Sequence, residues 1–240
     1  MVSIRVIAYT VYSYIVIVLL SVIFIIPAFI IVCIPRTSRY NRLVYYIVYG
    51  FYIITQKFSL LSIDYIGREN IPNQPCIFAA NHQSSFDIPL LGLLAGTSPH
   101  VWLARHDVLQ DFWFLGFIIK RLTVLVDVST PRQGMISLLR ISNMVQKNGD
   151  HIMIFPEGGR FTTGDVKKFY GGFVVLARRL NRPIIPVYIK GVHTVYPPNT
   201  WWARWGRIKV IIGKPFILQK NETDNDFKQR IHQWFVDQVP

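Results

Sequence analysis

Hydrophobic and polar positions divide the chain into an apolar N-terminal part and a mixed remainder. No charged residue occurs from Val6 to Pro35, a run long enough to cross about 30 Å of hydrocarbon. Because Pro27 permits a kink, both a spanning helix and one that enters a single leaflet remain open. The uncharged run Leu43 to Gln56 is shorter, and it predicts either a reclining interfacial helix or a core helix. We therefore expect membrane-anchoring helices in residues 1–62 and a separate domain in residues 63–240.

Beyond Asp64, short apolar runs alternate with longer helical patterns. The expected strands are Cys76 to Ala80, Thr123 to Val128, His151 to Phe155, Ile184 to Ile189 and Ile208 to Ile212. The expected helices are Phe86 to Leu94, Arg132 to Lys147 with apolar residues at Ile136, Leu139, Met144 and Val145, Gly172 to Leu180, and a last helix capped near Thr223 that presents Phe227, Ile231, Trp234 and Phe235. This alternation predicts an α/β fold with a largely parallel sheet flanked by helices.

Charge adds information about the partner. The net charge is +13 and the isoelectric point is near 9.9, so an anionic partner is expected. We expect no nucleic-acid binding, since neither a zinc finger nor an RNA-binding aromatic motif is visible. A lipid bilayer is the favoured partner. Arg36, Arg39 and Arg42 follow the apolar run, and this positive charge predicts that the domain lies on the cytoplasmic face. The aromatic and basic segment Tyr196 to Arg207 suits either the bilayer interface or a loop with buried indoles.

The first candidate chemistry follows the strand that ends at Ala80. His82 and Asp87 are five positions apart, so they meet only if the chain turns between them, and Asn81, Ser84 and Ser85 favour a turn. If they meet, the carboxylate fixes the imidazole tautomer and leaves the other ring nitrogen free as a general base. The alternative is a loop histidine that is merely satisfied by a nearby carboxylate.

A second candidate follows the strand that ends at Phe155. Pro156 stops the strand, and Glu157 and Arg160 then flank Gly158 and Gly159. Glycines allow close backbone approach to a ligand, and an arginine fork suits a phosphate. Glu157 is expected either to order Arg160 or to accept a substrate hydroxyl, whereas a surface turn with an exposed ion pair is the alternative. Carboxyl ends of parallel strands share one edge, so base and phosphate site are expected to converge there.

Together these segments resemble the glycerolipid acyltransferase family, in particular the enzymes that acylate lysophosphatidic acid. The likeness runs from about Gly67 to Gly213. His82 and Asp87 match the family's His-x4-Asp signature, and Phe155 to Gly158 with Arg160 match its Phe-Pro-Glu-Gly-x-Arg signature. Pro183 to Val187 looks like its late proline-containing strand on the acyl-binding side. Arg105 to Val108 stands where the family commonly has Lys-x-Glu-Leu, whose lysine is implicated in phosphate binding.

The chain also departs from the family's pattern. Asp127-Val128 replaces a usual Asp-Arg whose arginine is assigned to the phosphate, and the candidate replacements are Arg132, Lys120 and Arg121. Gly159 and Phe161 replace the usual Thr and Ser around Arg160. A lyso-lipid with a different head group therefore remains an alternative acceptor.

The resemblance implies transfer of a fatty acyl group from a thioester to the free hydroxyl of lysophosphatidic acid, giving phosphatidic acid for phospholipid biosynthesis. In that O-acyltransferase reaction, His82 and Asp87 are the expected catalytic residues, and Glu157, Gly158, Arg160 and Arg105 are the expected substrate-binding residues. The expected donor is acyl-coenzyme A or an acylated acyl carrier protein, with no bound cofactor. The alternatives are a lipid hydrolase that uses Ser84 or Ser85 and a non-catalytic lipid-binding protein. No metal site is predicted, because further ligands at suitable spacing are not evident.

Overall fold

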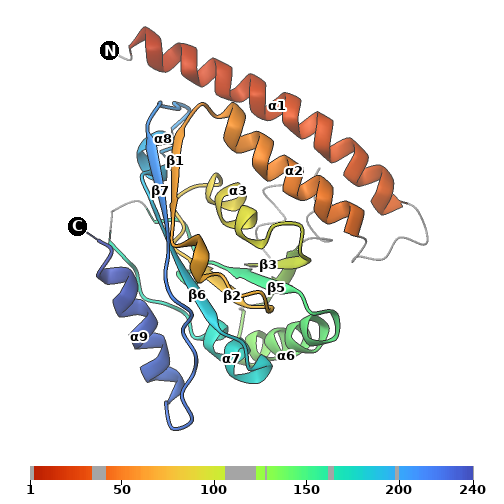
Figure 1. Ribbon diagram of the computed structural model, residues 1–240, viewed down its shortest axis with the longest axis vertical. Helices are drawn as coiled ribbons and strands as arrows, with labels where there is room; N and C mark the ends of the chain where they lie inside the picture. The colour runs from red at the N-terminus through yellow and green to blue at the C-terminus, as the bar shows by residue number, and fades with distance from the viewer. Residues whose placement is uncertain are drawn as a thin grey trace.

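The computed structural model describes residues 3–33, 42–105, 123–127, 129–161, 165–197 and 200–239. A seven-stranded sheet with the order β1-β7-β6-β2-β5-β3-β4 forms its centre (Figure 1). The strands are β1 (Ser62–Ile66), β2 (Ile77–Ala80), β3 (His100–Arg105), β4 (Thr123–Val126), β5 (His151–Ile154), β6 (Ile184–Lys190) and β7 (Arg207–Ile212). Neighbouring strands run parallel, except that β6 and β7 are antiparallel. The predicted largely parallel sheet is therefore confirmed.

The five strands expected from the sequence are present, with ends that differ by at most two residues. Two strands were not predicted. β1 is a short edge strand beside β7, and β3 begins at a histidine and ends at an arginine. The apolar pattern of these two segments resembles that of a loop. They are strands because β1 pairs with β7 and β3 pairs with β5, and such long-range pairing is not visible in the local sequence.

Helices cover both faces of the sheet (Figure 1). Successive residues of β2 point to opposite faces: Phe78 packs in the core that includes α3 (Asp87–Gly92), and Ile77 packs in the core under α6 (Pro131–Asn148), α7 (Gly172–Leu180) and α9 (Asp224–Val236). A one-turn helix, α8 (Val192–Val195), follows β6. This burial on both faces explains why β2 is apolar throughout.

The expected α6 and α9 are present. Of the four apolar positions named for α6, Val145 is buried and Met144 packs against the core, while the other two are exposed. Leu138, Ile141 and Val145 are buried, whereas Ile136 and Leu139 are exposed. The helix carries several overlapping apolar stripes, and contact with the sheet and α7 selects one of them. In α9 the Thr223 side chain accepts a hydrogen bond from the Asp226 N–H, which confirms the predicted cap.

Two N-terminal helices, α1 (Ile4–Cys33) and α2 (Arg42–Phe58), lie side by side above α3 (Figure 1). The segment Ile4–Phe24 of α1 is long and apolar enough to cross a membrane. In α2, Tyr45 and Tyr52 are buried against the domain, while Leu43 and Tyr46 are exposed. One face of α2 is therefore buried like that of a core helix, and the opposite face is exposed. Arg36 and Arg39 lie outside the described residues.

The aromatic segment after α8 lies below the N-terminal half of α1. Trp201 and Trp205 are exposed, so the alternative of a loop with buried indoles is wrong for these two side chains. Ala203 between them is buried, and its N–H donates to Thr10 Oγ1 of α1 at 3.0 Å. A backbone bond thus joins the segment to α1, while the side chains of Trp201 and Trp205 are largely exposed.

His100 joins α2 to the sheet. Its Nδ1–H donates to the Ser98 carbonyl at 3.0 Å, so Nε2 accepts from the Tyr52 hydroxyl at 3.3 Å. The Tyr52 hydroxyl in turn accepts from Trp102 Nε1–H at 3.2 Å. Burial lowers the pKa of His100 to about 4, because the cation cannot be solvated there.

This burial predicts acid lability. The pKa of His100 is lower in the folded than in the unfolded protein, so its contribution to stability is complete above pH 6.5 and is lost as the pH falls toward about 4. Replacing His100 with asparagine should lower stability at neutral pH and flatten the pH profile in this range by up to about 1.4 kcal/mol per pH unit. Urea unfolding in detergent at several pH values measures this slope, and a slope equal to that of the wild type contradicts the assignment.

Candidate active site

Asn81 fixes the direction in which the chain leaves β2. Its side-chain amide donates to the Ile189 carbonyl at 2.9 Å, and its Oδ1 accepts from the Ile189 N–H at 2.7 Å. The buried amide thus continues the pairing between β2 and β6 for one position beyond the last paired residues, Ala80 and Val187. The following residues consequently leave the sheet edge in a defined orientation.

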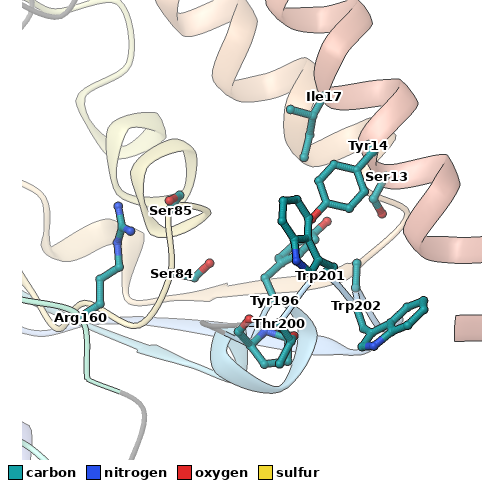
Figure 2. A pocket seen from close by; sticks show the side chains of 12 residues that line it. Ser13, Tyr14, Ile17, Ser84, Ser85, Arg160, Tyr196, Thr200, Trp201 and Trp202 are labelled. Carbon is teal, nitrogen blue, oxygen red and sulfur yellow. Dashed lines mark hydrogen bonds between the residues drawn. The ribbon is translucent and has the colours of Figure 1, made fainter. Parts of the chain in front are cut away.

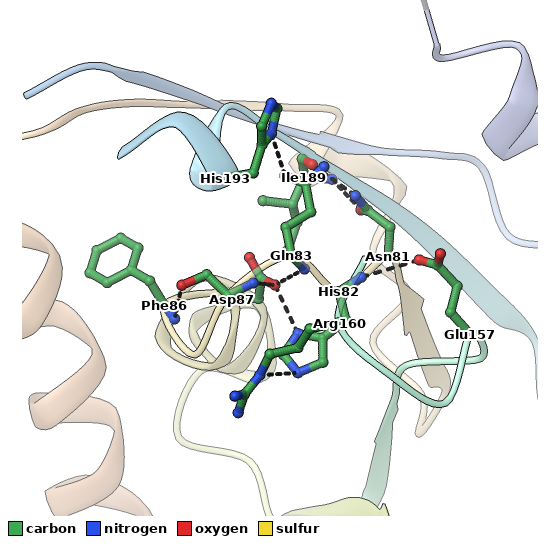
Figure 3. Close-up of polar contacts among 10 residues, drawn as sticks. Asn81, His82, Gln83, Phe86, Asp87, Glu157, Arg160, Ile189 and His193 are labelled. Carbon is green, nitrogen blue, oxygen red and sulfur yellow. Dashed lines mark hydrogen bonds and ion pairs between the residues drawn. The ribbon is translucent and has the colours of Figure 1, made fainter. Parts of the chain in front are cut away.

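His82 and Asp87 meet across the turn that follows (Figure 3). His82 Nδ1 lies 2.8 Å from Asp87 Oδ2, and the same oxygen accepts from the N–H groups of Gln83 at 2.6 Å and Ser84 at 2.8 Å. Asp87 is fully buried at the start of α3, and the side chain of His82 is 12% exposed. Since the carboxylate accepts at Nδ1–H, the lone pair of His82 is on Nε2.

The imidazole is also held by an aromatic ring. Its plane lies 8° from that of Phe155, with ring centroids 3.9 Å apart. Phe155 follows β5 directly, so the ring that supports His82 comes from the neighbouring strand. Stacking and the Asp87 hydrogen bond together leave the imidazole little rotational freedom, as a base requires for repeated proton transfer.

Arg160 reaches the same imidazole from the loop after β5. Its Nε–H donates to His82 Nε2 at 3.4 Å (Figure 3). The Phe161 N–H donates to the His82 carbonyl at 2.9 Å. The guanidinium is on the exposed side of the pair. Two segments almost 80 residues apart in sequence thus place a base and an anion-binding group side by side.

Glu157 is buried and binds main-chain groups. One carboxylate oxygen accepts from the His82 N–H at 3.3 Å and the other from the Lys167 N–H at 3.2 Å. Burial raises the pKa of Glu157, and the two N–H bonds oppose that rise. Figure 3 shows Glu157 on the other side of the His82 backbone from Arg160. Glu157 thus bridges two loops, whereas the sequence left open whether it orders Arg160 or accepts a substrate hydroxyl.

Gly158 occupies a position that a larger residue strains. Its φ is +68°, and a Cβ there lies 2.7 Å from the Tyr170 ring. Gly159 has no such backbone angle, and a Cβ there lies 3.4 Å from the Phe161 ring. The two adjacent glycines thus differ in both conformation and space.

Substituting each glycine with alanine tests this difference. Gly158→Ala should cost about 1–2 kcal/mol of backbone strain and displace Tyr170, whereas Gly159→Ala should be close to neutral. Unfolding midpoints and turnover of the two variants provide the comparison. Equal losses in both variants would contradict the assigned backbone geometry.

A cavity of about 320 Å³ adjoins the site (Figure 2). Ser84, Ser85 and Arg160 line one side of it (Figure 2). Its other walls come from α1 and the aromatic segment: Ser13, Tyr14, Ile17, Tyr196, Pro197, Thr200, Trp201, Trp202 and Ala203. The sequence did not predict that α1 forms part of this wall, because no spacing pattern relates residues so far apart.

Several expected site residues are described only in part. Arg105 ends β3 at the same sheet edge as the ends of β2 and β5, but its side chain lies outside the described residues. Lys120, Arg121 and Val128 also lie outside them. Arg132, in the first turn of α6, is exposed. The late proline strand is β6, in which Pro186 pairs with Ala79 of β2.

A His–Asp pair in the turn after β2, beside an arginine from the loop after β5, is the arrangement that the family signatures led us to expect. The family model described as Acyltransferase matches residues 62–190, more than half of the chain, and the protein belongs to this family.

Among curated relatives, the 1-acyl-sn-glycerol-3-phosphate acyltransferase of Pseudomonas aeruginosa is 28% identical over 174 residues, which cover 70% of this chain and 65% of the relative. The Saccharomyces cerevisiae protein of the same name is 29% identical over 192 residues, which cover 78% of this chain and 63% of the relative. The matched region is thus less than two thirds of either relative.

The fold has a solved counterpart. The crystal structure of the 1-acyl-sn-glycerophosphate (LPA) acyltransferase, PlsC, from Thermotoga maritima superimposes with a TM-score of 0.77. The superposition covers 100% of this chain and 97% of that chain, at 22% sequence identity. The likeness therefore includes both the N-terminal helices and the sheet, and it concerns the fold.

Proposed function

We propose that this protein transfers a fatty acyl group from a thioester to the free hydroxyl of lysophosphatidic acid, giving phosphatidic acid. The observation that carries the proposal is the convergence of three side chains: Asp87 Oδ2 at 2.8 Å from His82 Nδ1, and Arg160 Nε at 3.4 Å from His82 Nε2. The acceptor has a hydroxyl to be deprotonated and a phosphate to be bound, and these groups match the base and the guanidinium. The names of the curated relatives agree with this substrate.

In the proposed reaction His82 Nε2 takes the proton of the acceptor hydroxyl. The hydroxyl oxygen then attacks the thioester carbonyl carbon, a C–O bond forms, and the C–S bond breaks when the tetrahedral intermediate collapses. The imidazolium returns its proton to the departing thiolate, so His82 ends as it began. Asp87, buried and already bonded to Nδ1, stabilises the imidazolium during this cycle.

Arg160 has two partners in this proposal. Without substrate its Nε–H occupies the lone pair of His82 Nε2, which is the position that the acceptor hydroxyl needs. A phosphate offers the guanidinium a stronger, charge-assisted and bidentate partner than a neutral imidazole. Binding of the anionic head therefore moves Arg160 from His82 and frees the base. Arg105 is proposed as a second phosphate ligand, Gly158 as the position that lets the loop approach the substrate, and Glu157 as the brace of the His82 loop.

Residues 1–62 are proposed to keep the protein on the bilayer. Moving a 16-carbon chain into water costs on the order of 13 kcal/mol at about 0.8 kcal/mol per methylene, and an enzyme at the membrane avoids that cost. Polar side chains of α1 bond to the domain: Thr10 Oγ1 accepts from the Ala203 N–H at 3.0 Å, and the Tyr9 and Tyr196 hydroxyls lie 3.4 Å apart. These bonds favour a helix that lies along the domain in one leaflet. The basic residues Arg36, Arg39 and Arg42 support a domain on the cytoplasmic face.

Product analysis tests the proposed function. The purified protein in detergent is offered acyl-coenzyme A or acylated carrier protein together with a panel of lyso-lipids, and the products are resolved by mass. Phosphatidic acid as the main product supports the proposal and identifies the donor. Free fatty acid without acylated lipid would indicate the hydrolase, and binding without turnover would indicate a lipid-binding protein.

A further inference from the structure

The end of α2 with the turn after it, and the segment after α8, expose large apolar side chains beside the first turns of α1. We call these residues the loop surface: Phe58, 52% exposed; Leu60, 57%; Trp201, 79%; and Trp205, 66%. Large apolar side chains grouped on the outside of a protein mark an interaction site, because burial of each would be favourable. The loop surface is outside the catalytic pair, and only Trp201 of its members also lines the cavity.

Hydrogen bonds hold the loop surface in a defined shape. Trp205 Nε1–H donates to the Leu60 carbonyl at 2.7 Å, which joins the two loops to each other. The Phe58 carbonyl accepts from Tyr12 of α1, and the rings of Tyr14 and Trp201 lie 6.4 Å apart (Figure 2). The exposed indoles are therefore presented by an ordered scaffold that is continuous with α1.

Leu60, a member of the loop surface, has a strained backbone conformation. Its φ is +57°, the left-handed conformation that costs a branched residue about 1–2 kcal/mol and that glycine would adopt freely. Leu60 is exposed in the turn after α2, so its side chain adds no burial that would offset this strain. Strained residues of this kind are more common at functional positions.

The two segments that carry the loop surface contain charges of one sign. No acidic residue occurs from Met1 to Ile63 or from Gly191 to Asn221, so every charged side chain in these segments is lysine or arginine. Lys57, Arg204 and Arg207 are exposed beside the apolar residues. Tryptophan next to arginine suits the head-group region of a membrane, and basic residues are attracted to anionic lipids.

We propose that the loop surface inserts into the head-group region of a bilayer that contains anionic phospholipids, beside α1. Trp201 and Trp205 then fix the depth of the domain, and Arg204 and Arg207 bind lipid phosphates. The cavity that ends at Arg160 faces the same layer, since Trp201 belongs to both. This membrane contact does not depend on the proposed acyl transfer.

Lipid quenching of tryptophan fluorescence tests the contact without any turnover. The full-length protein is reconstituted in phosphatidylcholine and phosphatidylglycerol vesicles that contain phospholipid brominated near the head group. Wild-type fluorescence should be quenched, and the Trp201→Phe/Trp205→Phe variant should lose most of that quenching. The matched control is Trp102→Phe, in which a buried indole is removed and quenching should persist. Equal quenching in the double variant and the wild type overturns the proposal, and quenching of neither would point to a protein partner instead.

Two further variants and one control separate the apolar from the charged part. Leu60→Gly should leave the unfolding midpoint unchanged or higher, because it removes the strain, while it reduces quenching of Trp205. Ile136→Ala, which removes an exposed apolar side chain on α6, should not alter the quenching. Arg204→Gln/Arg207→Gln should abolish stronger quenching by brominated phosphatidylglycerol than by brominated phosphatidylcholine. A wild type without that preference overturns the anionic part of the proposal.

Discussion

Replacing His82 with alanine is expected to lower acyl transfer by about 10²–10⁴-fold, the usual contribution of a positioned general base. The Asp87 hydrogen bond fixes Nδ1–H, so no other nitrogen of this ring can take the proton. Phosphatidic acid formation under saturating donor and acceptor measures the loss. The effect should appear in kcat, because His82 acts on the hydroxyl during reaction and the phosphate is bound elsewhere.

Two further measurements distinguish a loss of catalysis in His82→Ala from a loss of folding. The unfolding midpoint of His82→Ala should remain near that of the wild type, since the main-chain bonds of this loop to Asp87 and Glu157 persist. Asp87→Asn should also lose activity, because an amide cannot stabilise the imidazolium as a carboxylate does. Retention of most transfer by a folded His82→Ala protein would exclude the role assigned to this residue.

Replacing Arg160 with alanine is expected to raise KM for lysophosphatidic acid by about 10–150-fold, equivalent to about 1.5–3 kcal/mol for hydrogen bonds to a charged group. A monoacylglycerol has the hydroxyl but no phosphate, so its slow acylation should be unaffected or faster in this variant. The ratio of kcat/KM for the two acceptors should therefore fall sharply. Arg160→Lys should recover only part of the loss, because an ammonium lacks the bidentate fork.

Arg140 provides the matched control for this measurement. It is an exposed arginine on α6, and Arg140→Ala removes the same charge without touching the His82 loop. Its kinetics should match those of the wild type. An equal fall in kcat/KM for the charged and the neutral acceptor in Arg160→Ala would mean that Arg160 does not bind the phosphate.

Local patterns predicted much of the fold. The bounds expected for α7, Gly172 to Leu180, are those observed, because an amphipathic stretch ends at Asn181 in the left-handed conformation. The meeting of His82 and Asp87 also followed from local residues, since Asn81, Ser84 and Ser85 favour a turn. Both cases depend on interactions within about ten residues of chain.

Long-range contacts determined what the sequence did not reveal. The cavity wall formed by Ser13 and Tyr14 depends on how α1 docks, and that docking is set by bonds such as Tyr9 to Ser59. The sequence allowed Glu157 to order Arg160 or to bind a substrate hydroxyl. Its contacts with two main-chain N–H groups became visible only once the loops were placed next to each other in space.

The most direct test of the account is a crystal structure of the protein with lysophosphatidic acid and no acyl donor, so that no reaction occurs. The account predicts the acceptor hydroxyl about 2.6–3.2 Å from His82 Nε2 and the phosphate on the Arg160 guanidinium, which has left that nitrogen. A phosphate bound away from Arg160, or a hydroxyl out of reach of His82, would contradict it.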